Sequence, residues 1–286
     1  MQISEKCLPC LVNQAVRVAG IAGVEDRHAL YREVFAELSR TDFTRSNPEL
    51  LGHFYKIITR HAKNDDPYRD IKRFYDEMFL KMSPEFERRI LGAEDPFYEA
   101  VKYAAVGNVI DFGPVHGVTQ EKVMRAFDGI SEKQLSPDDS ERLRGDVRAA
   151  ERILYIGDNC GEIALDRLLI RRMHAENPQA KITFAVRGAP IVNDITPEDA
   201  KLVKMDEEAE IISNGDSSQG TVLSRVSGEF RAVYDAADVI IAKGQANFES
   251  LSEEKGNIYF LMMVKCAVIA AYTGAKEGSL VCMRRK

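Results

Sequence analysis

Short apolar runs alternate with helical segments in the second half of the chain, and this rhythm restricts the fold more than any other feature. Clear runs span Arg152 to Ile156, Lys181 to Val186 and Asp238 to Ala242, and the segment from Ile163 to His174 has helical spacing. Weaker candidate strands lie at 210–212, 259–264 and 280–283. Strands that alternate with helices predict βαβ units and a parallel sheet.

The first half of the chain has a helical pattern instead. Apolar residues recur every three or four positions from Leu30 to Leu38, from Leu50 to Ile58 and from Ile71 to Met78. Helix starts are expected at Asp95-Pro96 and at Ser136-Pro137-Asp138, where a capping side chain precedes a proline. We predict a helical domain at residues 1–148 and an open, mostly parallel, Rossmann-like three-layer α/β domain at residues 149–286.

Composition limits the class of partner. The 286 residues are 45% hydrophobic and carry a net charge of −6, which disfavours general binding to nucleic acid. The start of the chain does not resemble a secretion signal, and the longest apolar stretch, Ile258 to Thr273, contains Lys265 and is too short to span a membrane. We expect a cytoplasmic protein with a small-molecule partner and no membrane contact. The oligomeric state is left open.

Polar residues follow the first predicted strand in the stretch from Gly157 to Glu162. Ligands of open parallel sheets bind at the carboxyl ends of the strands. Asp158 and Asn159 offer two oxygen ligands of the kind that Mg²⁺ or Mn²⁺ prefers. Gly161 and Glu162 open the next helix, whose free amides favour an anion such as phosphate. The alternative is a turn in which Asp and Asn only cap the helix.

Two further strand ends carry polar residues. Asp194, in the loop after the second strand, offers a third oxygen ligand, although it also suits the cap of a helix that starts near Thr196. Lys243 follows a later strand and can neutralise a phosphate, although a solvated turn is the simpler interpretation. In the first half, Asn108 and Asp111 are three residues apart and could face the same cleft, or Asn108 could simply end a helix.

Several familiar motifs are absent from the sequence. It has no Gly-x-x-x-x-Gly-Lys-Ser/Thr phosphate loop, no Gly-x-Gly-x-x-Gly turn and no Gly-x-Ser-x-Gly elbow. The five cysteines do not suggest a disulfide framework. Cys7 and Cys10 have the CxxC spacing of zinc sites and of redox motifs, and a four-cysteine zinc site would need distant partners such as Cys266 or Cys282.

The three strand-end motifs together resemble the metal-dependent damage-control phosphatases. The matching segments, in order along the chain, are Cys-Leu-Pro-Cys, Gly-Asn-Val-Ile-Asp, Gly-Asp-Asn-Cys-Gly-Glu, Asn193-Asp194 and Lys-Gly-Gln-Ala-Asn-Phe-Glu. The first two of these are similar to the prokaryotic branch of the family. The resemblance covers nearly the whole chain.

The resemblance implies a site and a reaction. It implies a divalent metal (Mn, Mg, Co or Ni) in a cleft between the two domains, with Asp158, Asn159 and Asp194 as ligands and Lys243 facing the phosphate. It also implies hydrolysis of phosphate monoesters of sugars or of damaged phosphorylated metabolites. Asn108 and Asp111 match a recurrent family segment, and we place them with the phosphate-binding candidates.

The mechanism that fits these residues is attack by a metal-activated water. A metal held by two carboxylates and one amide keeps positive charge for the phosphoryl oxygens. The Asp-x-Asp of haloacid-type hydrolases is absent. Two other functions stay open: a carboxyl methyltransferase, and a non-catalytic metal or redox module built on Cys7 and Cys10.

Overall fold

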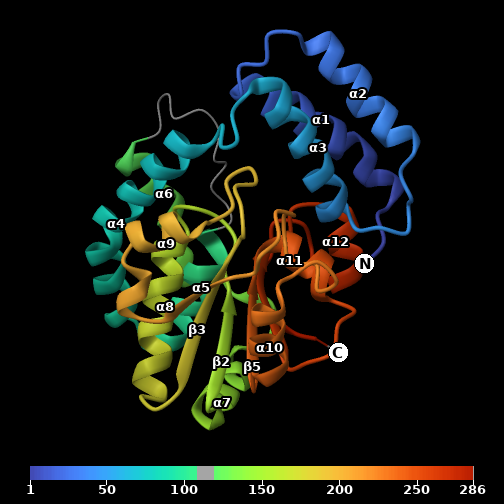
Figure 1. Ribbon diagram of the computed structural model, residues 1–286. Helices are drawn as coiled ribbons and strands as arrows, with labels where there is room; N and C mark the ends of the chain where they lie inside the picture. The colour runs from blue at the N-terminus through green and yellow to red at the C-terminus, as the bar shows by residue number, and fades with distance from the viewer. Residues whose placement is uncertain (108–118, 286) are drawn as a thin grey trace.

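A single sheet of seven strands crosses the molecule in the computed structural model, which describes residues 1–107 and 119–285 (Figure 1). The strands are β1 (Leu135–Asp138), β2 (Arg152–Ile156), β3 (Lys181–Val186), β4 (Glu210–Ser213), β5 (Val239–Lys243), β6 (Ile258–Met263) and β7 (Leu280–Arg284). Their order is β1-β7-β6-β5-β2-β3-β4, and every neighbouring pair is parallel except β6 and β7. The predicted α/β class with a mostly parallel sheet is confirmed.

The predicted strands are found within two residues of their expected bounds because their sequences are apolar on both faces. All five residues of β5 are buried, as are four of the five in β2. A parallel strand covered by helices on both sides must be apolar throughout, which produces the short continuous runs seen in the sequence.

One expectation at the edge of the sheet is wrong. Ser136-Pro137-Asp138 was expected to begin a helix, but these residues belong to β1, in which Leu135 pairs with Leu280 of β7. The helix begins only at Ser140, after Asp139. Proline is tolerated in β1 because this strand lies at the edge of the sheet and has a neighbour on one side only.

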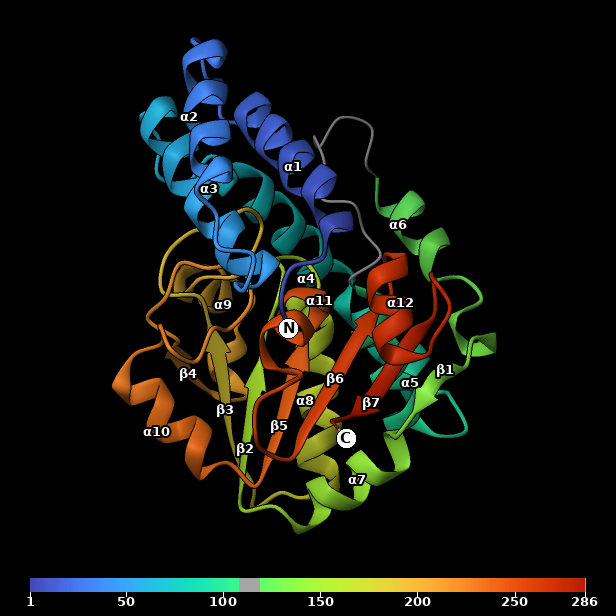
Figure 2. The same cartoon turned by 90° about the vertical axis from the view of Figure 1, so that its right-hand side faces the viewer.

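Helices cover both faces of the sheet (Figures 1 and 2). The face that carries Tyr155 and Ile241 packs against α4 (Arg69–Leu91), α5 (Pro96–Val106), α6 (Gln120–Phe127), α7 (Ser140–Ala149), α8 (Ile163–Glu176) and α9 (Pro197–Leu202). The opposite face, with Leu154 and Ile240, packs against α10 (Gly228–Ala236), α11 (Gly244–Leu251) and α12 (Ala267–Thr273). Short 3-10 turns lie at Glu5–Cys7, Ile130–Glu132 and Met205–Glu207.

Three helices form a separate apolar cluster above the carboxyl edge of the sheet. These are α1 (Leu8–Ile21), α2 (Arg27–Ser39) and α3 (Asn47–Ala62) (Figure 2). Ile191 and Val192, from the loop after β3, belong to the same cluster. The loop that carries Asp194 is therefore held between the sheet and these helices. None of the described helices has an apolar stretch of the length that a membrane crossing needs.

The division at residue 148 stays a prediction. Residues before position 148 contribute to the sheet and to its helical cover: β1 pairs with β7, and α5 packs on α8. Only α1 to α3 have an apolar cluster of their own.

The topology places the expected site at a switch point of the sheet. From β2 the chain runs through α8 to β3 on one side, whereas β5, the other neighbour of β2, is followed by α11 on the opposite face. The chain therefore leaves β2 and β5 toward opposite faces of the sheet, and these two strand ends mark the switch point. Open α/β sheets bind their ligands at such points.

Gly188, in the loop after β3, is expected to be important for stability. A Cβ on Gly188 would lie 2.5 Å from the backbone carbon of Gly215 and 2.7 Å from the amide nitrogen of Asp216. We expect Gly188→Ala to lower the free energy of unfolding by about 1–3 kcal/mol, because two backbone segments would have to separate. Urea unfolding measures this effect.

Gly145→Ala is the matched control. Gly145 lies inside α7, and a Cβ there meets nothing within 4 Å. Alanine at this helical position should raise stability by about 0.5–1 kcal/mol. Equal effects of the two substitutions would contradict the packing argument.

Candidate active site

Asp158 and Asn159 form the turn that follows β2. Asn159 Nδ2 donates to Asp158 Oδ2 at 2.6 Å, and this hydrogen bond fixes the two side chains relative to each other. The backbone of the turn pairs with the loop after β3, because Ile195 N donates to Asp158 O and Cys160 N donates to Asn193 O. This pairing forms an isolated bridge between Asn159 and Asp194. The three residues that the sequence proposed as metal ligands therefore lie together.

Arg187 connects the two carboxylates. It directly follows β3 and is only 1% exposed. Its Nε donates to Asp194 Oδ2 at 2.6 Å, and its Nη2 lies 3.6 Å from Asp158 Oδ1. On the other side, Nη1 donates to Thr221 Oγ1 at 3.2 Å. A planar guanidinium fixed at both ends holds the carboxylates at a defined separation.

The environment of Asp194 suits a cation. Its side chain is fully buried, and Oδ1 has no partner at hydrogen-bond geometry among the described residues, although the Gln219 side chain lies close enough to lower the pKa of the carboxyl group. Burial, together with the negative charge of Asp158, raises the pKa of Asp194 to about 7 despite the contact with Arg187. A buried carboxylate oxygen without a donor is costly unless a cation satisfies it.

The donor set fits a hard divalent metal. Two carboxylates and one carboxamide are the oxygen ligands that Mg²⁺ and Mn²⁺ prefer. In the described part of the chain, this site included, no group of three or more His, Cys, Asp or Glu side chains could hold a metal ion by itself. The set Asp158, Asn159 and Asp194 has only two such side chains, and its third oxygen ligand is the carboxamide of Asn159. These three residues remain our candidates.

Lys243 lies under the site and has two carboxylate partners. Its Nζ donates to Asp166 Oδ1 at 2.5 Å and lies 3.5 Å from Glu162 Oε1, and all three side chains are fully buried. Burial alone would lower the pKa of Lys243, but Asp166 and Glu162 outweigh it and raise the pKa. Lys243 therefore stays charged. In this structure the ammonium group of Lys243 is engaged by Asp166 and Glu162. A direct contact between Lys243 and phosphate therefore stays a prediction.

A cavity of about 620 Å³ opens in front of Asp158 and Asn159. Its walls come from the N-terminal segment, α1, the loops after β2 and β3, α11, and the start of α12. Exposed cations at its rim are Lys6, Arg17 and Lys265. The volume suits a small metabolite rather than a polymer.

Gly161 and Glu162, the expected phosphate-binding residues, do not line this cavity. Gly161 has a φ of 73°, which suits glycine, and its amide donates to Asp76 Oδ1 at 2.5 Å. Glu162 is buried beside Lys243, and burial raises its pKa to about 8. Their contact with phosphate stays a prediction. Asn108 and Asp111 lie outside the described residues.

Asp76 supports the turn from α4 and is expected to matter for activity. Asp76→Ala would leave the buried Gly161 amide without its acceptor, so we expect about a tenfold loss of activity and a loss of about 1–3 kcal/mol in stability. Asp76→Asn retains an acceptor oxygen and should keep most of the activity. Kinetics on both variants would test this, and equal losses would show that the hydrogen bond is not the cause.

Sequence reasoning missed Arg187, Asp166 and Asp76. Arg187 had a signal, since it is the first residue after an apolar run, at the same edge as the other candidates. Asp166 lies three residues into α8, where acidic residues are common. Asp76 lies in the middle of a long helix, and only the tertiary fold brings it to the turn.

Comparison with known proteins identifies the family. The model of the damage-control phosphatase ARMT1-like domain matches residues 3–281. A damage-control phosphatase of Pyrococcus horikoshii is 35% identical over 291 residues, covering 100% of this chain and 99% of the relative. A damage-control phosphatase of Archaeoglobus fulgidus is 31% identical over 288 residues, covering 98% of each chain.

A solved structure agrees with these sequences. The crystal structure of a DUF89 family protein from Pyrococcus horikoshii superposes with a TM-score of 0.92 at 34% identity and covers 100% of both chains. The resemblance expected from the strand-end motifs is thereby confirmed. The chain belongs to the ARMT1-like damage-control phosphatase family, and its enzyme class is that of a phosphatase.

Proposed function

We propose that this protein is a metal-dependent phosphatase that hydrolyses phosphate monoesters of small metabolites, such as sugar phosphates or damaged phosphorylated metabolites. The observation that carries the proposal is that Asp158, Asn159 and Asp194 meet at the ends of two neighbouring strands. Asp158 and Asn159 line a cavity of about 620 Å³, and Asp194 is buried behind them. The net charge of −6 argues against general binding to nucleic acid.

Each group of residues in the site would have its own role. Asp158, Asn159 and Asp194 would hold a divalent cation such as Mn²⁺, Mg²⁺, Co²⁺ or Ni²⁺, and Arg187 fixes the two carboxylates. When bound, the cation would supply positive charge to the phosphoryl oxygens and lower the pKa of a water molecule. The cations at the cavity rim favour an anionic substrate, and the cavity walls orient its organic part.

Removal of the metal tests this proposal. The purified protein would be treated with a chelator, dialysed, and assayed with an aryl phosphate and with a series of sugar phosphates. We expect activity to fall to background and to return on addition of Mn²⁺, Mg²⁺, Co²⁺ or Ni²⁺. Full activity after exhaustive chelation would contradict metal dependence while leaving a phosphatase activity intact.

The metal should also bind at the stated residues. Isothermal titration with Mn²⁺ would be compared between the parent protein and Asp194→Asn. The substitution removes one of two carboxylates in the donor set, so we expect affinity to fall at least about tenfold. Unchanged affinity would place the metal elsewhere.

A further inference from the structure

Three cysteines lie together at the wall of the cavity, and the proposed phosphatase mechanism uses none of them. Cys7 caps the start of α1, Cys10 lies in its first turn, and Cys266 caps the start of α12. All three line the same cavity as Asp158 and Asn159, and all three are free thiols. Figures 1 and 2 both place the N-terminal segment beside α12.

The other two cysteines are of a different kind. Cys160 and Cys282 are fully buried in the main apolar core, and burial raises the pKa of both thiols well above the usual value. They are shielded from reagents and poor in thiolate. The five cysteines therefore divide into three at the cavity and two in the core.

The geometry of Cys7 and Cys10 suits a bond between them. Residues three apart at a helix start have Cα atoms about 5 Å apart. Disulfides accept Cα separations of about 4.4–6.8 Å. Pro9, between the two cysteines, occupies one of the first helical positions, where proline is tolerated. A disulfide can therefore close here without unwinding α1.

A metal is the competing interpretation of this cluster, and the structure favours it less. Cys7, Cys10, Cys266 and their neighbours do not form a group of three or more thiol, imidazole or carboxylate side chains that could hold a metal ion, and no such group occurs in the described part of the chain. The nearby Glu249 carboxylate is engaged by Gln245 Nε2 at 3.0 Å and Asn47 Nδ2 at 3.3 Å. Burial and the charge of Glu249 raise the pKa of Cys10, and burial also raises that of Cys7, so mildly alkaline pH is needed to populate the thiolates that react.

We propose that Cys7 and Cys10 form a reversible disulfide in the wall of the active-site cavity, with Cys266 as the neighbouring thiol that stays reduced. The oxidant is a small disulfide such as oxidised glutathione. The Cys10 thiolate, which is the more exposed, attacks one sulfur and releases a glutathione thiolate. The Cys7 thiolate then attacks Cys10 Sγ and releases the second glutathione as a thiolate. Two electrons pass to the oxidant, and the two protons end on the glutathione thiols.

This proposal does not depend on the metal-dependent reaction. The site is a modification site at the cavity wall, built from residues other than the proposed metal ligands. Thiol state and phosphatase activity can therefore be measured separately, and failure of one proposal leaves the other standing.

Peptide mass spectrometry tests the proposal directly. Trypsin cleaves after Lys6, Arg17, Lys265 and Lys276, which leaves Cys7 and Cys10 in one peptide and Cys266 in another. The native protein would be incubated with oxidised glutathione at mildly alkaline pH, alkylated and digested. We expect the peptide 7–17 to lose two hydrogen atoms and to resist alkylation, while the peptide 266–276 is alkylated. Reduction should restore alkylation of the first peptide.

A thiol titration on the native protein gives an independent count. We expect three of the five thiols to react before oxidation and one after it. Cys266→Ser should still form the disulfide, whereas Cys7→Ser should stop at a mixed disulfide on Cys10.

Three results would overturn the proposal. One is a bond from Cys10 to Cys266, seen in the parent protein as a reducible cross-link between the peptides 7–17 and 266–276 that is lost in Cys266→Ser. Another is stoichiometric zinc on the purified protein, with thiols that react only after chelation. The third is a peptide 7–17 that stays fully reduced under oxidised glutathione.

Discussion

Replacement of Asp158 by asparagine is expected to lower the kcat/KM for phosphate-ester hydrolysis by about 10³-fold. Asp158 is 4% exposed, lines the cavity, and contacts both Asn159 and Arg187. Asparagine keeps the shape of the side chain but removes one of the two negative charges available to a divalent cation. Steady-state kinetics at saturating Mn²⁺ would measure the loss.

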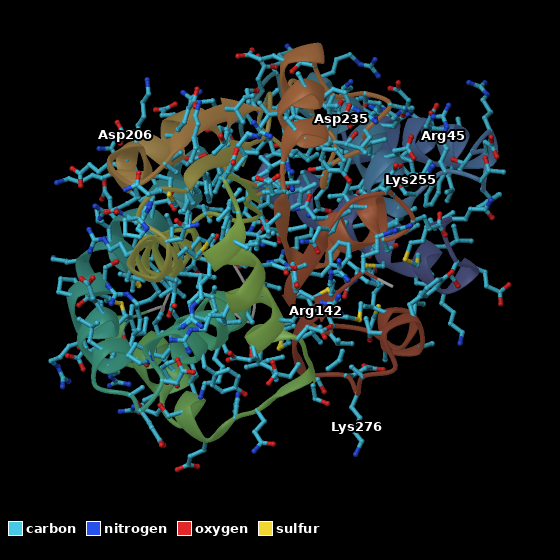
Figure 3. The ribbon with its side chains drawn as sticks, turned by 90° about the horizontal axis from the view of Figure 1, so that it is seen from below. Arg45, Arg142, Asp206, Asp235, Lys255 and Lys276 are labelled. Atoms are coloured by element: carbon cyan, nitrogen blue, oxygen red, sulfur yellow. The ribbon has the colours of Figure 1, made fainter. Side chains whose placement is uncertain are left out.

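The same substitution at a remote aspartate is the control. Asp206 is an exposed residue at the periphery of the molecule (Figure 3), and Asp206→Asn should leave kcat/KM within about twofold. Circular dichroism and urea unfolding of Asp158→Asn would confirm that the variant is folded. A folded Asp158→Asn protein with near-normal activity would remove Asp158 from the reaction and overturn the proposed site.

The class of fold could be predicted because the decisive signal is local. Each buried strand is a short apolar run, and each run is followed by glycine or polar residues where the chain leaves the sheet. Arg152 to Ile156 and Lys181 to Val186 became β2 and β3 without change of bounds. The failure at Ser136-Pro137 has the opposite cause. Edge pairing with β7 decides the conformation there, and that pairing depends on residues about 145 positions away.

The position of the site could be predicted from the sequence to the same extent as the fold. Carboxyl ends of neighbouring parallel strands must meet at one edge, so residues after β2 and β3 could be brought together without coordinates. The bridge between Asn159 and Asp194 agrees with this reasoning. The same reasoning does not give side-chain direction, which is why Lys243 was expected to face a phosphate although its described partners are Asp166 and Glu162.

Contacts across the layers could not be predicted at all. The Asp76 carboxylate reaches the Gly161 amide over 85 positions of sequence, and no local pattern marks either residue as a partner of the other. The cavity is similar in this respect, because its walls combine α1 with loops from the sheet and with α12. Its shape sets which small molecules can enter.

Replacement of Lys243 by methionine is expected to destabilise the protein by about 3–5 kcal/mol, the largest stability effect we predict. Lys243 is the cation of a fully buried cluster with Asp166 and Glu162. Burial already raises the pKa of Glu162 to about 8 and also raises that of Asp166, even with Lys243 beside them. Glu162, with its pKa near 8, already binds a proton for much of the time at neutral pH, so the Asp166 carboxylate is the group that loses its cation. Without the lysine it would have to bind a proton or remain charged in the core, and either state is costly.

Urea unfolding of Lys243→Met against Lys276→Met would measure this loss. Lys276 is exposed and projects from the surface (Figure 3), so its substitution should change stability by no more than about 0.5 kcal/mol.

The experiment also separates the two roles of Lys243. A lysine that acts mainly on the phosphate would leave stability nearly unchanged and raise KM in a well-folded enzyme. A lysine that neutralises Asp166 and Glu162 would lower stability first, and activity would follow the fraction of folded protein. The buried contact of 2.5 Å with Asp166 supports the second outcome.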